Sequence, residues 1–350
     1  MTAPVDLQHY RMPAEWMPHL GTILTWPHRP DIWRGVHRDV EVIYGRICAE
    51  LSQVEEVHIN VPNPEVRRVA ERVATRAGAN AEKLVWHLVD SDDVWARDHG
   101  PIFVTKKPNA PADLPPLVML DWDFNAWGNK FQSALDNEIP RLMNEFFQVP
   151  RVQPGLIMEG GSLEVNGVGD LLTTEAVLLN DNRNPQLARG EIEASLKLHL
   201  GAERLHWLAE GLEGDDTDGH IDDIARFVAE DAIVAVIAPQ THPDFLAMAQ
   251  NLVRLKSLRG GPKNQPFRLT TLPSPEPISF QGEHLPASYA NFYIANGIVL
   301  VPIFQQKTDA EAIAHLQALF PTRKVIGIDG RPLVTQYGNI HCITQQIPAV

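Results

Sequence analysis

Four short segments of the sequence concentrate side chains that can act as a nucleophile, an acid, a base or a cation ligand. They are DVWARDHGP (93–101), EGGS (159–162), DDTDGHIDD (215–223) and GNIHCIT (338–344). Each segment follows a β-rich run, and active sites are commonly assembled from loops at one end of a set of strands. The four segments therefore predict one shared site.

Cys342 is the strongest candidate for a nucleophile. The chain has 2 cysteines, and Cys48 falls on the apolar stripe of a predicted helix, where a cysteine behaves as a small hydrophobic residue. Cys342 instead follows a Gly-Asn turn and has polar neighbours. The adjacent His341 is expected to face the opposite way, because successive side chains alternate along an extended segment. The partner histidine is therefore expected in another segment.

His220 is the candidate general acid and base. It lies in a strongly acidic segment, where nearby carboxylates favour the imidazolium form. The same surroundings also fit a solvated surface histidine. The H-x-D spacing of His220 and Asp222 favours the functional interpretation, because it puts both side chains on one face of an extended segment. Glu159 is either a satisfied turn carboxylate or the group that orients His220.

The remaining acids indicate a bound cation. Asp93 follows a β-rich run and is expected to face the pocket, whereas Asp98 can form a structural ion pair with Arg97. Asp93 and Asp222 around one site repel each other unless a cation compensates their charge. That cation can be a metal ion or a guanidinium group, whose planar donors match carboxylates bidentately.

Two enzymatic hypotheses use these acids differently. In the first, the H-x-D motif and several aspartates bind a pair of metal ions, as in manganese ureohydrolases, and Cys342 has no role. In the second, a Cys342 thiolate attacks a bound guanidinium while His220 acts as acid and base, and all four segments are used. A polyamine-binding module that is not an enzyme would share the acids and tryptophans but gives no reason for Cys342.

Apolar periodicity predicts the elements that position these segments. Helix-type spacing covers 38–53 and 63–77, and further helices begin near residues 134, 185, 242 and 308. Asn63 and Pro64 are the expected N-cap and first residue of the second helix, and Thr308 and Glu311 have capping-box spacing. Strands are predicted at 84–89, 155–158, 204–208, 266–271 and 324–328, with further short strands at 162–165, 170–179, 224–237 and 291–303.

From residue 63 onward the pattern consists of five helix-to-strand units, ~50 to ~70 residues apart, without detectable sequence identity between units. No linker or charge run separates them, and the Pro-rich stretch 108–116 is typical of a surface loop. We therefore expect a single α/β domain over residues 1–350.

The composition fits a protein that binds a small cation. The 350 residues contain 30 Lys+Arg and 44 Asp+Glu, a net charge of −14. This acidic balance argues against nucleic acid and anionic membranes as partners. Residues 1–10 lack the pattern of a signal peptide, and no apolar run approaches the ~18 residues of a membrane span. We expect a cytoplasmic protein with two free thiols.

The segments and their order resemble the agmatine deiminases of the bacterial peptidylarginine-deiminase-like family, within the guanidino-group-modifying (amidinotransferase) superfamily. The matching stretches are MPAEWMPHLGTILTWPHRPDIWRG (12–35), DVWARDHGP (93–101), DFNAWGNK (123–130), EGGSLEV (159–165), LLTTEAVLLNDNRNP (171–185), TDGHIDD (217–223), ASYANFYIANG (287–297) and GNIHCITQQIP (338–348). The resemblance implies the pentein fold, a five-bladed α/β propeller with pseudo-fivefold symmetry.

The resemblance also implies a reaction. It is the hydrolytic deimination of agmatine to N-carbamoylputrescine and ammonia, a step toward putrescine and the polyamines, through a covalent thiouronium intermediate on cysteine. Neither a metal ion nor an organic cofactor is implied. The expected partner is a small cationic guanidino substrate, and a homo-oligomer is left open. Deimination of free or peptidyl arginine remains an alternative within the same chemistry.

Carried over residue by residue, the resemblance implies that Cys342 is the nucleophile, His220 the general acid and base, and Glu159 the group that orients His220. Asp93 and Asp222 would bind the guanidinium group. The ammonium end calls for aromatic or acidic partners. The aromatic candidates are Trp26, Trp33, Trp95 and Trp127. The chain departs from the family at Gln336-Tyr337, where further glycines are usual, and this difference can reshape the pocket floor near Cys342.

Overall fold

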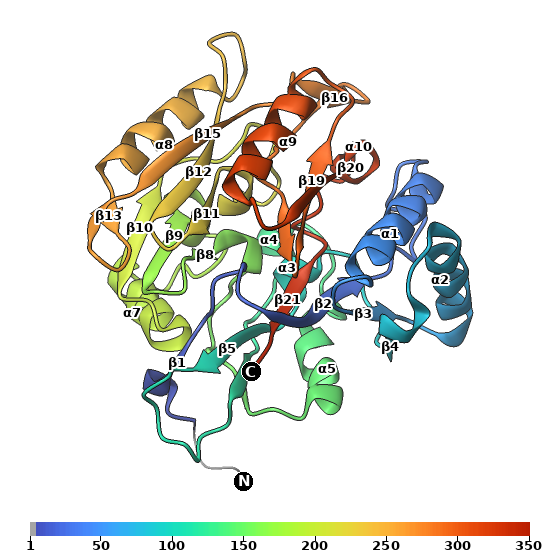
Figure 1. Cartoon of the computed structure of the whole chain (residues 1–350), viewed down its shortest axis with the longest axis horizontal. Helices are drawn as coiled ribbons and strands as arrows, with labels where there is room; N and C mark the ends of the chain where they lie inside the picture. Colours follow the sequence, from blue (N-terminus) through green and yellow to red (C-terminus); the bar gives the residue numbers. More distant parts are fainter. Residues whose placement is uncertain (1–4) are drawn as a thin grey trace.

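A computed structural model describes residues 5–350 of the chain. Its longer helices lie around the outside of the molecule, and strands β8, β11 and β21 lie nearer the middle (Figure 1). Within the described residues, five sheets share one pattern. An antiparallel pair of strands is followed by a helix, and the helix leads to a third strand parallel to the second. The α/β class predicted from the sequence is therefore confirmed.

One of these sheets joins the two ends of the chain. Its strands, in spatial order, are β21 (Gln345–Pro348), β2 (His19–Thr25), β3 (Glu56–Val61) and β4 (Leu84–Leu88). The connecting helices are α1 (His37–Leu51) and α2 (Pro64–Ala77). Because β21 pairs antiparallel with β2, the segment just before β21 is anchored to the N-terminal part of the protein.

The other four sheets follow in chain order. The first contains β5 (Ile102–Lys106), β6 (Leu117–Leu120), helix α5 (Ile139–Phe147) and β7 (Arg151–Val152), with β1 (Tyr10–Arg11) at its edge. The second contains β8 (Glu164–Val165), β9 (Asp170–Thr174), α7 (Arg189–Leu200) and β10 (Arg204–Leu208). The third contains β11 (Ala225–Ala229), β12 (Ala232–Ile237), α8 (Phe245–Ser257) and β15 (Arg268–Pro273). The fourth contains β18 (Tyr293–Ala295), β19 (Ile298–Ile303), α9 (Thr308–Leu319) and β20 (Lys324–Asp329).

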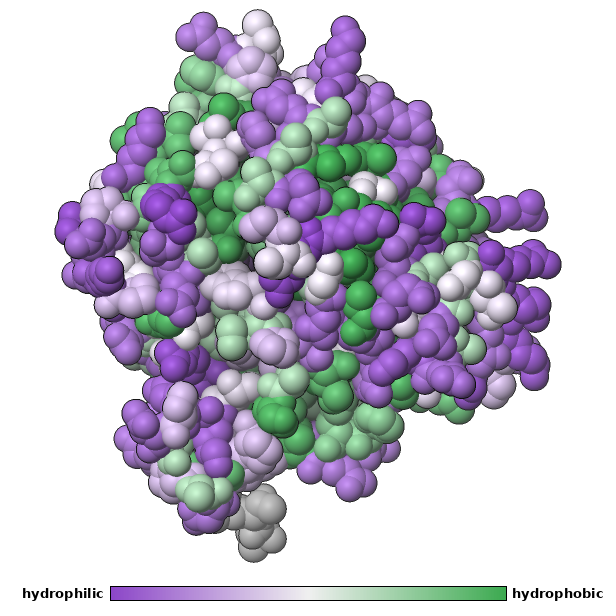
Figure 2. Space-filling view, in the orientation of Figure 1, coloured by the Kyte–Doolittle hydropathy of each residue, from purple (hydrophilic) through white to green (hydrophobic). Residues whose placement is uncertain are grey.

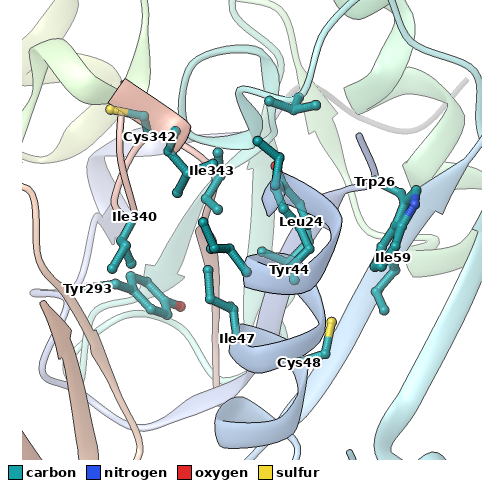
Figure 3. Close-up of a cluster of buried hydrophobic side chains, with 14 of the residues drawn as sticks. Leu24, Trp26, Tyr44, Ile47, Cys48, Ile59, Tyr293, Ile340, Cys342 and Ile343 are labelled. Atoms are coloured by element: carbon teal, nitrogen blue, oxygen red, sulfur yellow. The ribbon is translucent and has the colours of Figure 1, made fainter. Parts of the chain in front are cut away.

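Helices α1 and α2 show why the periodicity was informative. The predicted stripe of α1 is buried, Cys48 included, and it packs in a hydrophobic cluster with residues of β2 and β3. Figure 3 shows this cluster around the turns of α1. At the start of α2, the Asn63 side chain accepts hydrogen bonds from the backbone N–H groups of Glu65 and Val66, as an N-cap residue does.

Two sequence predictions are wrong, because a side chain from elsewhere in the chain makes hydrogen bonds with the residues concerned. Residues 155–158 form no strand, because the Asn184 side chain accepts from Ile157 N at 3.0 Å and donates to Ile157 O at 2.9 Å. The strand after α5 is β7 instead. Thr308 is the first residue of α9 and not its N-cap. Its hydroxyl lies 2.8 Å from the Tyr289 hydroxyl.

Several helices and strands also begin or end at residues other than those predicted from the sequence. The helix expected from about 134 is a short 3-10 turn, η3 (Asp136–Glu138), followed by α5, and the helix expected from about 185 begins only at Arg189. The strand expected over 170–179 ends at Thr174, where the one-turn helix α6 (Glu175–Leu178) begins. The expected strands 224–237 and 291–303 are hairpins, because each contains a tight turn.

The surface is mixed in polarity. Hydrophilic side chains cover much of the face shown in Figure 2, with hydrophobic ones interspersed. Among residues 5–350, no helix combines the length and the apolar character that crossing a membrane requires.

Two small hairpins lie outside the five sheets. They are β13 (Arg259–Gly260) with β14 (Gln265–Pro266), and β16 (Ile278–Phe280) with β17 (Glu283–Leu285).

Candidate active site

The segments predicted to carry chemistry converge because each one precedes the first strand of a different sheet. Segment 93–101 precedes β5, 159–162 precedes β8, 215–223 precedes β11 and 338–344 precedes β21. In the β5–β6 pair, the start of β5 lies beside the end of β6, since the two strands are antiparallel. The segments thus lie at the carboxyl edge of the parallel strands, where α/β proteins commonly bind ligands.

Short helical turns bring these segments into contact. They are α3 (Ala96–His99), η4 (Gly160–Ser162) and η5 (Ile221–Asp223). Turn α3 contacts η4, and η4 contacts η5. His220 is the N-cap residue of η5, so the H-x-D segment is a turn and not the extended strand that the sequence interpretation assumed. His220 and Asp222 nevertheless reach the same site.

Cys342 is buried where these segments meet. Its side chain is 6% exposed, and Figure 3 shows the sulfur pointing away from the hydrophobic cluster, whereas Cys48 lies on α1. Asn291 Nδ2 donates to Cys342 Sγ at 3.1 Å, and Asp222 Oδ2 lies 4.0 Å from Sγ. Asn291 comes from the segment before β18. The sequence interpretation missed it, although the stretch containing it matches the family.

The resting thiol of Cys342 is held protonated. Burial raises its pKa well above the ordinary value, and the negative charges of Asp222, Asp223 and Asp98 raise it further. A cation bound between these carboxylates opposes their effect on the thiol. The site therefore couples the formation of the thiolate to the binding of a positively charged ligand.

His220 lies between two carboxylates. Its Nδ1 is 3.7 Å from Asp98 Oδ1, its Nε2 is 3.9 Å from Glu159 Oε2, and its side chain is 1% exposed. Burial alone lowers the pKa of a histidine, but the charges of Asp98, Glu159 and Asp222 outweigh it and raise the pKa of His220 to about 10. At neutral pH His220 is thus an imidazolium, the form that can donate a proton.

A buried ion pair with Arg183 fixes the Glu159 side chain. Its Oε1 accepts from Arg183 Nε at 2.6 Å, and both side chains are fully buried. Arg183 also pairs with Asp218 at 2.7 Å. The second oxygen of Glu159 is left facing His220, and the orienting role of Glu159 stays a prediction.

The raised pKa of His220 predicts a pH dependence of stability. A group whose pKa is higher in the folded state stabilises the fold below its unfolded pKa of about 6.5, and the contribution is lost as the pH rises toward the folded value of about 10. The difference in free energy of unfolding between the wild type and His220→Gln should therefore shrink from pH 6.5 to pH 10. Urea unfolding across that range measures it, and a constant difference would contradict the assignment.

Position 161 has no room for a side chain, because the backbone there packs closely against His220 and Asp98. A Cβ atom at this position would lie 2.4 Å from His220 Nδ1 and 2.8 Å from Asp98 Oδ1. The Gly161 backbone N–H also donates to Asp98 Oδ1 at 2.9 Å. The Gly-Gly pair of this segment therefore lets the backbone of η4 pack directly against the histidine.

Replacing Gly161 with alanine should displace His220. We expect a loss of about 1–3 kcal/mol in stability from overpacking and a fall in turnover of about 100-fold from misplacement of a reacting group. Gly190 in α7 is the matched control, because a Cβ there meets nothing within 4 Å. Gly190→Ala should keep full turnover. Steady-state kinetics and thermal unfolding test both variants, and normal turnover of Gly161→Ala would contradict the packing argument.

Asp98, for which the sequence interpretation offered only a structural ion pair, faces His220. In addition to Gly161 N, its carboxylate accepts a hydrogen bond from Trp127 Nε1 at 3.0 Å, and it faces His220. Burial raises the pKa of Asp98 to about 6, while the charge of His220 opposes the rise. The expected Asp98–Arg97 ion pair is wrong, because Arg97 pairs with Glu15 at 3.3 Å.

Asp93 lies apart from the cysteine and the histidine. Its Oδ1 accepts from the backbone N–H of Val94 at 2.8 Å, and within residues 5–350 no hydrogen bond or ion pair joins it to Cys342 or His220. Burial raises the pKa of Asp93 to about 6. Its charge contributes to raising the pKa of Asp216 to about 8, an effect caused first by burial and by Asp215. The guanidinium contact predicted for Asp93 stays a prediction, and Asp216 is a further acid that the sequence interpretation missed.

The candidate tryptophans all belong to one buried hydrophobic cluster, but they contact different groups. Trp95 packs against the turn before the nucleophile, where a Cβ on Gly338 would lie 2.3 Å from the ring, and Trp127 binds Asp98. Trp26 is fully buried against Tyr44, with ring centroids 5.7 Å apart. Figure 3 shows Trp26 across α1 from Cys342. The prediction that Trp26 binds substrate is therefore wrong, because the end of β2 turns its ring into the core.

Two predictions about the segment of the nucleophile are also corrected. Residues 340–343 form a turn, so His341 does not face away from Cys342, and its Nδ1 lies 2.6 Å from Asp222 Oδ2.

Tyr337, in the stretch that departs from the family pattern, donates its hydroxyl to Glu283 at 2.7 Å and accepts from Arg34 at 3.2 Å. Its side chain thus ties two neighbouring loops together.

Solved structures share this architecture. The chain superposes on an agmatine deiminase of Enterococcus faecalis with a TM-score of 0.90 and 28% identity, covering 99% of this chain and 98% of the other. A C. jejuni agmatine deiminase with a cysteine-to-serine substitution and substrate bound matches with a TM-score of 0.86 and 31% identity, covering 97% and 96%. The protein thus has the α/β fold of the agmatine deiminase structures.

The chain belongs to the Porphyromonas-type peptidyl-arginine deiminase family, whose model matches residues 11–348. Among characterised relatives, the agmatine deiminase of Ectopseudomonas mendocina is 35% identical over 97% of this chain and 96% of its own length. The agmatine deiminase of Medicago truncatula is 34% identical over 97% of both chains. The family resemblance noted in the sequence is therefore confirmed over nearly the whole chain.

Proposed function

We propose that this protein is an agmatine deiminase, which hydrolyses agmatine to N-carbamoylputrescine and ammonia. The observation that carries the proposal is the buried group of Cys342, His220, Asp98 and Asp222, in which a thiol, an imidazolium and two carboxylates face one pocket. The carboxylates supply acceptors for the planar donors of a guanidinium group. The similarity to agmatine deiminases over 97% of the chain supports the same conclusion.

In the first half-reaction, substrate binding generates the nucleophile. Asp98 and Asp222 hold the guanidinium group, and its positive charge favours ionisation of Cys342, whose proton passes to solvent because His220 is already protonated. The sulfur attacks the guanidinium carbon, so that a C–S bond forms and a tetrahedral adduct results. His220 then donates its proton to one nitrogen, which leaves as ammonia when its C–N bond breaks. A covalent thiouronium on Cys342 remains.

In the second half-reaction, water releases the product. His220, now neutral, removes a proton from a water molecule that attacks the thiouronium carbon. The C–S bond breaks, the departing thiolate takes up the proton of the newly formed hydroxyl, and the carbon retains a carbonyl oxygen and two nitrogens as a carbamoyl group. Glu159, fixed by Arg183 at 2.6 Å, keeps the imidazole in position through both steps.

The charges around the pocket favour agmatine over arginine. The buried arginines of residues 5–350 are Arg97, Arg183 and Arg226, and each already pairs with a carboxylate of the chain. An α-carboxylate would therefore find no free buried guanidinium. We assign the ammonium end of agmatine to the partly buried acids Asp93 and Asp216, which lie outside the group of Cys342 and His220. Trp95 and Trp127 line the way between the two ends.

We further propose that the five similar sheets form a pseudo-fivefold α/β propeller within a single domain of residues 1–350. In this arrangement each sheet would contribute the segment before its first strand to the centre, and the β21–β2 pairing brings the two ends of the chain into one sheet. A symmetric arrangement of this kind explains why the site draws one residue or more from every unit.

The direct test incubates the purified protein with agmatine or with arginine, with and without a chelator, and measures ammonia and urea. We expect ammonia from agmatine, no urea, and no effect of the chelator. Release of urea that is lost on chelation would establish a metal-dependent ureohydrolase instead. Ammonia from arginine at an equal or greater rate would overturn the choice of substrate.

A further inference from the structure

His341, the residue beside the proposed nucleophile, bridges two carboxylates. Its Nδ1 lies 2.6 Å from Asp222 Oδ2, its Nε2 lies 2.7 Å from Glu15 Oε2, and its side chain is 1% exposed. Ionised carboxylate oxygens only accept hydrogen bonds, so a ring that bonds to both must carry a proton on each nitrogen. His341 is therefore positioned as a buried imidazolium.

Both carboxylates remain ionised in this arrangement. Burial alone raises the pKa of Glu15, but the charges of Arg226, His341 and Arg97 hold it well below its ordinary value. The pKa of Asp222 is likewise lowered, because the hydrogen bond and charge of His341 outweigh burial. Neither partner can thus supply a proton of its own to His341.

Glu15 is anchored by several parts of the fold. Its Oε1 accepts from the backbone N–H of Ile294 at 2.8 Å and pairs with Arg226 Nη2 at 3.0 Å. Its Oε2 contacts Arg97 Nη2 at 3.3 Å in addition to His341. These groups come from α3, β11, β18 and the turn before β21. Glu15 is therefore a rigid support, since four sheets contribute to holding it.

The bond from His341 determines what Asp222 can offer to a ligand. Oδ2 of Asp222 is engaged by His341 and lies 4.0 Å from Cys342 Sγ. Oδ1 of Asp222 is buried and has no hydrogen-bond partner within residues 5–350. A buried hydrogen-bond acceptor without a partner costs free energy, and a donor from a bound ligand would remove that cost. The bridge thus leaves one aspartate oxygen free beside the sulfur.

We propose that Glu15 and His341 are positioning residues of this site: Glu15 keeps His341 charged, and His341 holds Asp222 with one oxygen open to the guanidinium donors. This inference rests on the proposed function, because it takes a guanidinium group as the ligand of Asp222. The imidazolium also offsets the negative charges of Asp222, Asp223 and Asp98 next to the cysteine. Without it, the thiol becomes harder to ionise.

The test compares His341→Gln, His341→Asn and Glu15→Gln with the wild type. In Glu15→Gln, one of the two carboxylates of the bridge is lost, so His341 is held through Asp222 alone. Glu55→Gln is the matched control. Glu55 is also a buried carboxylate, which accepts from Asn296 N at 2.8 Å and lies 3.5 Å from His19, the ring that contacts the Glu15 backbone carbonyl at 2.7 Å. Within residues 5–350, no hydrogen bond or ion pair joins the Glu55 side chain to Cys342, His220 or Asp222.

Two measurements read out the effect. Alkylation of Cys342 by iodoacetamide, scored by peptide mass across pH, reports ionisation of the thiol without any substrate. We expect its midpoint to rise by about one pH unit in the His341 and Glu15 variants, as for the loss of a nearby charge. The KM for agmatine should rise about 10-fold with a smaller change in kcat. Glu55→Gln should lose stability and keep both values.

A double variant shows whether His341 acts through Asp222. His341→Gln added to Asp222→Asn should give no further shift of the alkylation midpoint, whereas an additive shift would overturn the proposal. Unchanged alkylation and KM in the folded His341 and Glu15 variants would also overturn it. Failure of the wild type to release ammonia from agmatine would reject the proposed function alone, because the alkylation comparison does not depend on turnover.

Discussion

Replacing Cys342 with serine should abolish the release of ammonia from agmatine while the protein stays folded. The two side chains have nearly the same shape, but a serine hydroxyl is not ionised by a neighbouring guanidinium at neutral pH, so no thiouronium can form. We expect turnover to fall by at least about 1,000-fold, because removing one member of a catalytic unit leaves only residual catalysis. Ammonia assays and thermal unfolding on the same preparation measure both properties.

Cys48→Ser is the control for this substitution. Cys48 is fully buried in the hydrophobic cluster around α1. Placing a hydroxyl there should cost about 1–3 kcal/mol of stability and leave turnover unchanged. The two variants thus separate chemistry from packing. Near-normal turnover in Cys342→Ser would remove Cys342 from the reaction. If a folded Cys48→Ser protein lost turnover, the loss in Cys342→Ser could come from disturbed packing, and the comparison would not identify the nucleophile.

Replacing Asp98 with asparagine should weaken the reaction far more than replacing Asp93. Asp98 faces His220 at 3.7 Å and lies with Asp222 near the cysteine, so its loss removes a charged acceptor of the guanidinium and lowers the pKa of His220. A hydrogen bond to a charged group contributes about 1.5–3 kcal/mol, which corresponds to a fall in kcat/KM of about 10- to 100-fold.

Asp93→Asn makes the same chemical change at the other end of the segment. Because Asp93 is proposed to face the ammonium end with Asp216, we expect a rise in KM of less than about 10-fold and an unchanged kcat. The contrast between the two variants decides which aspartate binds the reacting group. A kcat that falls in Asp93→Asn and not in Asp98→Asn would restore the assignment made from the sequence.

Much of the architecture could be predicted from the sequence because the signals are local. The stripe of α1, the N-cap at Asn63 and the strands that follow α2, α7 and α9 depend on residues within a few turns of one another. The predictions failed where a distant group competes for the backbone, as Asn184 does at Ile157. A side chain 27 residues away leaves no trace in the periodicity.

By itself, the sequence determined the α/β class of the fold and marked Cys342, His220, Glu159 and Asp222 as candidate reactive residues, through residue type, short spacing and the family resemblance. Only the tertiary structure decided which groups meet them. Asp98 and not Asp93 faces the histidine, and Asn291 and Glu15 reach the site from segments 51 and 326 residues away from the turn of the nucleophile. Spacing constrains the conformation of one segment, whereas the meeting of five segments depends on how their sheets pack.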